Sequence, residues 1–211
     1  MSALLSLQSP SAFSGLLAVG QKATPGLPPL PGTDLELIRI QEQSQGHAIT
    51  CIDGNLVTPA RVLAGMEECS WIHLACHAMQ DTINPLESAF YLHGGTLQLA
   101  AITQKQLKHA ELAFLSACQT ATGERSLSEE AVHLAAGMLM AGYRTVIATM
   151  WSIGDADAPL IAEEIYGRLF AGEAPDARRA ALAVHKATER LRAKVGVKEF
   201  SRWVPYIHIG I

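Results

Sequence analysis

Five short apolar runs, separated by segments with helical periodicity, constrain the fold of this 211-residue chain more than any other feature. Each run is mostly continuous in hydrophobic residues, which is typical of parallel strands covered on both faces. Alternating strands and helices require right-handed crossovers, so the pattern predicts an α/β fold with a mostly parallel central sheet and helices on both of its faces. The expected strands are residues 15–20, 47–53, 70–78, 112–119 and 145–151.

Helix signals fall between and after these runs. A small hairpin is expected between the third and fourth strands, because Gly94-Gly95 separates two short apolar runs. The tail 202–211 is expected to add an edge element, since Pro205 is poorly placed in a central strand. The expected helices are residues 33–46, 58–68, 126–142, 157–170 and 176–196, with Asp157 and Asp176 at the starts of the last two.

Composition favours one compact domain. Hydrophobic residues make up 49% of the chain and charged residues 17%, which argues against disorder. We expect a single domain over residues 1–211, in which residues 1–13 are a disordered start or the remnant of a preceding region. The net charge of −4 provides no basic field for nucleic acid or an anionic membrane, so neither is expected as a partner.

The expected location is the cytoplasm. The start of the chain has no basic residue before its apolar stretch, and the longest apolar window is too short to span a membrane. The four cysteines form no CxxC pair and lie in apolar runs, which is typical of a reducing compartment.

A cysteine and a histidine stand where two expected strands end. The third strand ends at Cys76-His77-Ala78 and the fourth contains Cys118. Functional groups collect at the carboxyl ends of parallel strands, and neighbouring strands lie about 4.8 Å apart. His77 beside Cys118 would therefore form a nucleophilic dyad in which the imidazole lowers the pKa of the thiol. The alternative is that Cys118 is a core cysteine and His77 a polar strand end.

The cluster of Cys69, His73, Cys76 and His77 does not predict a metal site. Alternate side chains of a strand face opposite sides, so these four cannot converge without bending the strand. We expect no metal and no cofactor, and we interpret His73 as a core histidine.

Several acidic residues are candidates for the rim of the site. Asp155 follows the fifth strand at the same edge of the sheet, where it could bind a basic substrate residue, and Asp81 and Glu87 are further candidates. The competing interpretation is helix capping, which suits Asp157 particularly well. Trp151 is expected either under the pocket or in the core.

Five stretches of the chain resemble the CHAT domain, a caspase-like cysteine peptidase family related to separases. They are "WIHLACHA", "NPLESAFYLHGGTLQL", "AELAFLSACQTATG", "EEAVHLAAGMLMAGYRTVIATMWSIGDADAP" and "WVPYIHIG". The resemblance runs from about Leu17 to the C-terminus. It implies a three-layer caspase-like fold with a small inserted hairpin, and hydrolysis of protein or peptide substrates through an acyl-enzyme.

The resemblance also implies roles for individual residues. His77 matches the catalytic histidine and Cys118 the nucleophile, with the backbone N–H groups of Cys118 and Ala78 as oxyanion donors. Ser116 and Thr120 depart from the caspase signature, so a preference for aspartate is not implied. The family commonly has glycine where this chain has Ala78, and alanine would be unfavourable if the backbone there needed a positive φ.

Two other functions remain open, of which the first is implied by the resemblance. A CHAT-like domain can be a catalytically weak or inactive scaffold within a larger protein that carries helical-repeat or nucleotide-binding regulatory modules. A thiol redox sensor would need a second, resolving cysteine near Cys118, and the sequence has none there.

Overall fold

The structure, a computed structural model, describes residues 12–81, 83–105, 107–116, 118–119 and 131–211. Residues 1–11, for which a disordered start or a remnant of a preceding region is expected, lie outside the described residues. The first part of the expected helix 126–142, up to residue 130, also lies outside them.

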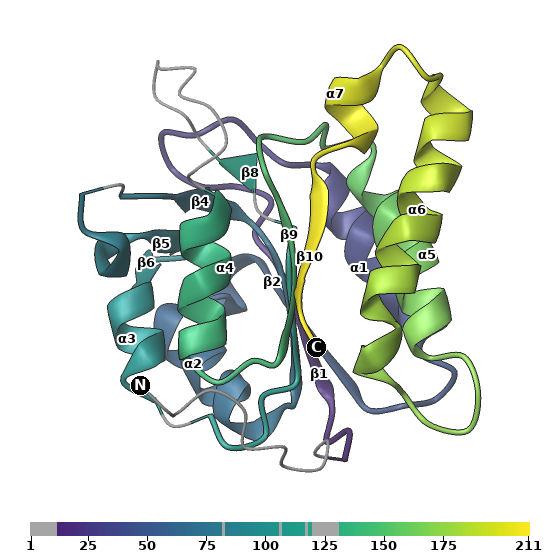
Figure 1. The fold of residues 1–211 in the computed structure, drawn as a ribbon. Coiled ribbons are helices and arrows are strands. Elements are labelled where there is room, and N and C mark those ends of the chain that lie inside the picture. Colours follow the sequence, from purple (N-terminus) through teal and green to yellow (C-terminus); the bar gives the residue numbers. More distant parts are fainter. Residues whose placement is uncertain (1–11, 82, 106, 117, 120–130) are drawn as a thin grey trace.

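A six-stranded sheet forms the centre of the molecule in the order β10-β9-β7-β3-β1-β2 (Figure 1). Every pairing in it is parallel except that of β10 with β9. The expected edge element at the C-terminus is therefore confirmed as an antiparallel strand. The strands are β1 (Leu16–Gly20), β2 (Ile49–Asp53), β3 (Trp71–Ala75), β7 (Leu112–Leu115), β9 (Thr145–Thr149) and β10 (Tyr206–Gly210).

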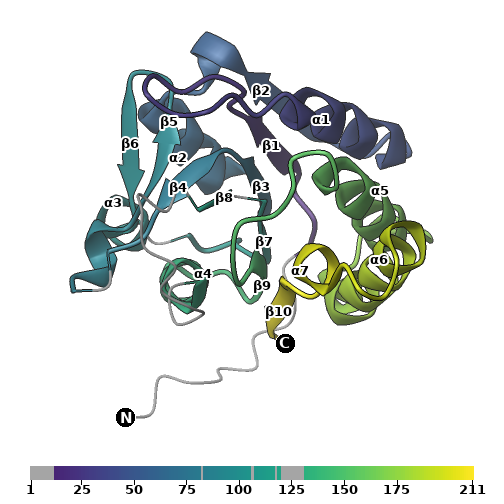
Figure 2. The ribbon, with the colours of Figure 1, turned by 90° about the horizontal axis from the view of Figure 1, so that it is seen from above.

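Helices cover both faces of this sheet and give three layers, as Figure 2 shows from above. Alternate residues of β1 enter different cores: Leu16 and Ala18 pack with Ile40 on one face, and Leu17 and Val19 pack with Val62 on the other. One layer holds α1 (Gly32–Gln43), α5 (Ala158–Leu169) and α6 (Ala180–Val195); the other holds α2 (Pro59–Glu68), α3 (Leu99–Thr103) and α4 (Ala131–Met140). Short helical turns are η1 (Gly54–Leu56), η2 (Pro85–Glu87), η3 (Ala177–Arg179) and α7 (Phe200–Trp203).

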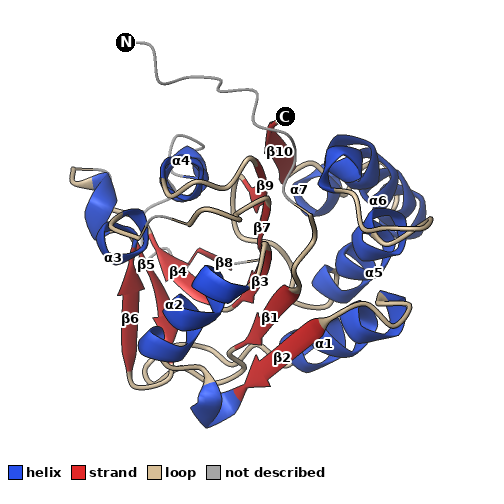
Figure 3. Cartoon of the chain, turned by 90° about the horizontal axis from the view of Figure 1, so that it is seen from below, coloured by secondary structure: helices blue, strands red, loops and turns tan. Residues whose placement is uncertain are grey.

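A second, four-stranded sheet lies beside the layer of α2 and α4, in the order β6-β5-β4-β8 (Figure 3). The expected hairpin is confirmed: Leu92 pairs with Gly95, and Gly94 has a φ of 77° that suits a tight turn. The strands of this sheet are β4 (His77–Met79), β5 (Ala89–Leu92), β6 (Gly95–Gln98) and β8 (Cys118–Gln119).

The expected third and fourth strands are each divided between the two sheets, which corrects their predicted bounds. In the main sheet, β3 follows β1 up to the pair of Ala75 with Gly20. The chain of β1 then leaves into the loop 21–31, so β3 loses that partner. Residues 77–79 instead pair with β5, and β8 joins them on the other side. The departure of β1 thus accounts for the division of the third expected strand.

Within the part of the chain that the structure describes, no helix is both long enough and apolar enough to cross a membrane.

Candidate active site

The pairing of β4 with β8 places His77 and Cys118 directly beside each other. They are in-register partners of two parallel strands (Figure 2), and such strands lie about 4.8 Å apart. The backbones thus meet as the dyad requires, although in the second sheet rather than at the strand ends of the first.

The imidazole of His77 has a defined partner on one side. Its side chain is buried, with 3% of the residue exposed, and Nε2 lies 2.8 Å from the carbonyl oxygen of Pro28. A carbonyl oxygen can only accept, so Nε2 carries the proton of the neutral ring and donates it. Nδ1 is then the unprotonated nitrogen, and it has no hydrogen-bond partner among the described residues. This tautomer leaves Nδ1 as the atom that can take a proton.

Pro28 was not predicted as part of the site. It lies in the proline-rich loop that follows β1, 49 residues before His77. The contact uses a backbone carbonyl, which any residue type supplies. The sequence signal that was available was the concentration of prolines after the first strand.

Ala78 shows no backbone strain. It lies in β4, where it pairs with Phe90 on one side and with Gln119 on the other. Among the described residues only Gln45 and glycines have a positive φ, so alanine is accommodated at position 78. The role of its N–H group as an oxyanion donor stays a prediction.

Asp155 lies at the carboxyl edge of β9, and its carboxylate contacts the first residue of α1. Its Oδ2 accepts a hydrogen bond of 2.6 Å from the N–H of Gly32. A carboxylate at this position satisfies an otherwise unpaired N–H and interacts favourably with the helix dipole. Asp155 therefore caps a helix distant in sequence, and its binding to substrate stays a prediction.

Asp157 does not cap α5 with its side chain, which corrects the expectation. It precedes the helix, but its carboxylate makes no capping hydrogen bond. Both oxygens instead accept from Arg202 of α7, at 2.7 Å from Nε and 2.6 Å from Nη2. This two-point contact fixes α7 beside the loop that follows β9. Trp151 of that loop is half-buried and donates from Nε1 to the carbonyl of Ser201, 2.8 Å away.

Asp81 and Glu87 both bind within the loop after β4. Asp81 Oδ1 accepts from the N–H groups of Ile83 and Asn84, at 2.9 and 2.7 Å. Glu87 is exposed, and its Oε1 accepts from the amide of Asn84 at 2.9 Å. These carboxylates shape the loop beside the candidate site, and their contact with substrate stays a prediction.

The other cysteines lie in different environments. Burial raises the pKa of the Cys51 thiol, with a smaller contribution from Asp53, and burial with a smaller contribution from Glu68 raises that of Cys69. Cys76 is fully buried. A raised pKa leaves less thiolate at neutral pH, so Cys51 and Cys69 are poor nucleophiles there.

His73 lies in the core, with Nε2 3.1 Å from Glu36 Oε1 and both side chains at most 2% exposed. The two atoms are close enough for an ion pair, but neither makes a hydrogen bond of good geometry. In the described part of the chain, no three histidine, cysteine or acidic side chains converge as metal ligands would.

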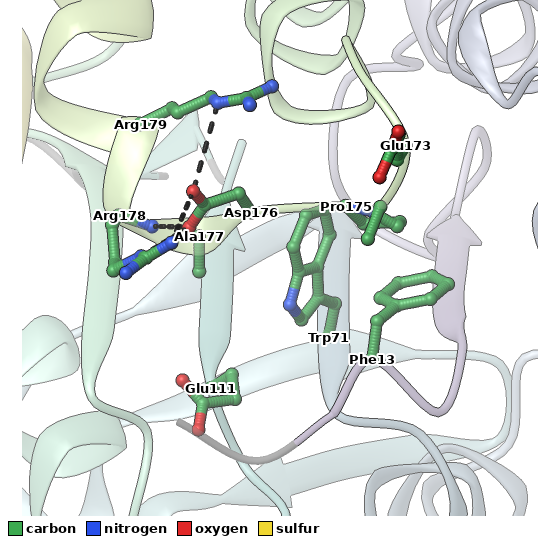
Figure 4. A pocket seen from close by; sticks show the side chains of 10 residues that line it. Phe13, Trp71, Glu111, Glu173, Pro175, Asp176, Ala177, Arg178 and Arg179 are labelled. Atoms are coloured by element: carbon green, nitrogen blue, oxygen red, sulfur yellow. Dashed lines mark hydrogen bonds and ion pairs between the residues drawn. The ribbon is translucent and has the colours of Figure 1, made fainter. Parts of the chain in front are cut away.

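Figure 4 shows a cavity of about 470 Å³, and His77 is not among the residues that line it. Trp71 and Glu111, at the amino ends of β3 and β7, line it together with Phe13 and Asp176. On the carboxyl edge, a cavity of about 370 Å³ lies beside Gly20 and Asp53, where β1 and β2 end. The cavity of about 470 Å³, at the amino ends of β3 and β7, is therefore separate from the candidate dyad.

Comparison with known proteins identifies the family and the fold. The family model of the CHAT domain matches residues 2–211. A solved complex of Porphyromonas gingivalis RgpB pro- and mature domains is similar with a TM-score of 0.55 and 14% identity, over 94% of this chain and 47% of that chain. The Arg-specific cysteine proteinase gingipain R (RgpB) is similar with a TM-score of 0.52 and 13% identity, over 84% of this chain and 42% of that chain.

No curated protein matches the sequence significantly. The chain spans less than half the length of the two solved structures. At these identities the likeness shows the fold, and that fold is caspase-like, as the sequence predicted.

Proposed function

The chain belongs to the CHAT domain family and has the fold of caspase-like cysteine peptidases, and from this premise we propose that it is a cysteine endopeptidase. Cys118 is the nucleophile and His77 the base. The observation that carries the proposal is the register of β4 and β8, in which these two residues are direct partners.

The proposed reaction follows from the tautomer of His77. Nδ1 takes the proton of the Cys118 thiol, and the thiolate attacks the carbonyl carbon of the substrate peptide bond. The resulting imidazolium keeps its Nε2–H bond to the Pro28 carbonyl, and this bond strengthens when the ring is charged. Nδ1 then returns the proton to the departing amine, and water hydrolyses the thioester to release the acyl group.

The substrate is a protein or peptide, and we propose helical-repeat or nucleotide-binding modules as regulatory partners. We propose the cytoplasm as the site of action, because a catalytic thiol and three further free cysteines suit a reducing compartment.

Alkylation by iodoacetamide tests the dyad. A thiol with the ordinary pKa of about 8.5 is about 3% thiolate at pH 7, whereas a pKa of about 6.5 gives about 75%. We therefore expect Cys118 to react at least about 10-fold faster at pH 7 in the unsubstituted chain than in His77→Ala. Peptide mapping by mass spectrometry follows each thiol, with Cys51 and Cys69 as internal controls whose rates the substitution leaves unchanged.

Equal, slow labelling of all four cysteines would refute the dyad. Cleavage of a peptide library, with Cys118→Ala as the inactive control, then defines the specificity. Activity that survives in Cys118→Ala would exclude this residue as the nucleophile.

The burial of His77 favours a second candidate, an inactive scaffold. Only 3% of the residue is exposed, so a substrate could not reach the ring in this arrangement. A scaffold would show no cleavage of any library peptide, and substituting His77 would leave the alkylation of Cys118 unchanged.

A further inference from the structure

We propose that Asp155 is a positioning residue for His77, which acts through the start of α1 and the proline-rich loop. The inference rests on the proposed function and deepens it, because it assigns the group that holds the Pro28 carbonyl in place. Asp155 itself would touch neither substrate nor thiol.

The first step is the close contact between Asp155 and Gly32. The hydrogen bond from the Gly32 N–H to Oδ2 is 2.6 Å long and joins residues 123 positions apart in the chain. A Cβ atom at Gly32 would collide with the backbone carbonyl oxygen of Asp155, so the two backbones touch and only glycine fits without movement. The loop after β9 and the start of α1 are therefore held as one unit.

The second step is the stiffness of the chain between Gly32 and Pro28. Three of the five residues 27–31 are proline, which fixes φ near −65°, and the remaining two each precede a proline and are restricted to extended conformations. The segment is also tied at Leu30, whose N–H donates to the Lys22 carbonyl at 2.8 Å. Its carbonyl accepts from the Thr33 hydroxyl at 2.8 Å. A displacement of Gly32 is thus transmitted to the Pro28 carbonyl instead of being absorbed.

The third step is the effect on the imidazole. The Pro28 carbonyl is the group that holds the proton on Nε2 and leaves Nδ1 as the base. A hydrogen bond to a charged ring is about twice as strong as one to a neutral ring, so losing its alignment disfavours the imidazolium. The thiolate that pairs with the imidazolium becomes less stable, and the pKa of the Cys118 thiol rises.

The experiment measures the pH midpoint of Cys118 alkylation in three variants. For Asp155→Ala we expect the midpoint to rise by about 0.5 to 1 pH unit from a starting value of about 6.5, with a reaction about 1.5- to threefold slower at pH 7. Asp155→Asn keeps an oxygen that can accept from Gly32 and should retain the original midpoint. Glu42→Ala is the control, because it removes an exposed carboxylate from the other end of α1, where its partner is Arg39.

A merely structural role for Asp155 would lower the thermal unfolding temperature and leave the midpoint unchanged, and that result would overturn the proposal. The proposal would also be overturned if the pH midpoint of Cys118 alkylation rose as much in Asp155→Asn as in Asp155→Ala. If Asp155→Ala does not fold, Gly32→Ala replaces it in the test, because its methyl group pushes the backbones of residues 32 and 155 apart. The same rise in the pH midpoint of Cys118 alkylation is then expected. Failure of the proposed function is a different result: the unsubstituted chain would then show no midpoint that depends on His77.

Discussion

The buried pair of Glu36 and His73 predicts strong energetic coupling between α1 and β3. Glu36 Oε1 and His73 Nε2 are 3.1 Å apart, and the side chains are 2% and 0% exposed. Two aromatic rings also contact the imidazole: Phe114 meets it edge-on at 4.7 Å between ring centroids, and Tyr166 at 5.6 Å. Burial, with a smaller contribution from Glu36, also holds the pKa of Tyr166 well above its usual range. When either Glu36 or His73 is substituted, water therefore does not take its place as the polar partner of the other residue.

The magnitude follows from this geometry. At the separation of 3.1 Å between Glu36 and His73, two unit charges attract by about 5 kcal/mol at an effective dielectric constant near 20. Replacing His73 by Phe leaves a buried carboxylate alone, which costs about 3–5 kcal/mol. Replacing Glu36 by Leu leaves the imidazole without a polar partner, at about 1–3 kcal/mol. The double variant removes both polar groups and should lie within about 1 kcal/mol of the original stability, or above it.

Urea denaturation at pH 7, followed by tryptophan fluorescence, measures the free energy of unfolding of all four proteins. We expect the double-mutant cycle to give a coupling of about 3–8 kcal/mol, the sum of the two single costs less that of the double variant. Additive single effects, with a coupling below about 0.5 kcal/mol, would refute the reasoning, because they would mean that the two groups are separately solvated or separately paired.

Two further predictions concern β10. Burial lowers the pKa of His208, so the folded state favours the neutral ring, and stability is fully present above the ordinary pKa of about 6.5 and is lost as the pH falls below it. His208→Gln should therefore flatten the decline in the free energy of unfolding between pH 7 and 5, and an unchanged slope would contradict this assignment. Gly210 has a φ of 127°, and a Cβ there would collide with the carbonyl oxygen of Arg144. Gly210→Ala should lower stability by about 1–3 kcal/mol from backbone strain and by more from the collision, as measured in thermal unfolding. Gly196→Ala is its control, with a φ of 99° and open space around the added methyl group.

Residue type and spacing in the sequence predicted strands, helices and the tight turn, because each of these depends on a short segment of the chain. The alternation of Leu16 to Val19 between two cores and the turn at Gly94-Gly95 follow from residue type and spacing. The division of the third strand does not, because it depends on where β1 ends, at Gly20. Pairing between distant segments leaves no periodic signal in either of them.

The site shows the same limit. The order of the expected strands and the family resemblance both predicted that His77 lies beside Cys118. In the structure these two residues are partners in the register of β4 and β8. The partners of Asp155 and Asp157 are Gly32 and Arg202, 123 and 45 residues away. A carboxylate that caps a remote helix or binds a remote arginine looks the same in sequence as one that faces solvent, so the polar contacts around the dyad were not predicted.

The shortness of β4 and β8 bears on how the proposed activity would be lost. Strands of three and two residues share few backbone hydrogen bonds, whereas β3 and β7 are enclosed between two helix layers. Local opening costs less where fewer bonds must break, so amide protons at the dyad should exchange with deuterated solvent before those of the central sheet. Mild denaturant would then separate the two segments of the proposed dyad while the bulk of the domain stays folded, and loss of the proposed activity would precede unfolding.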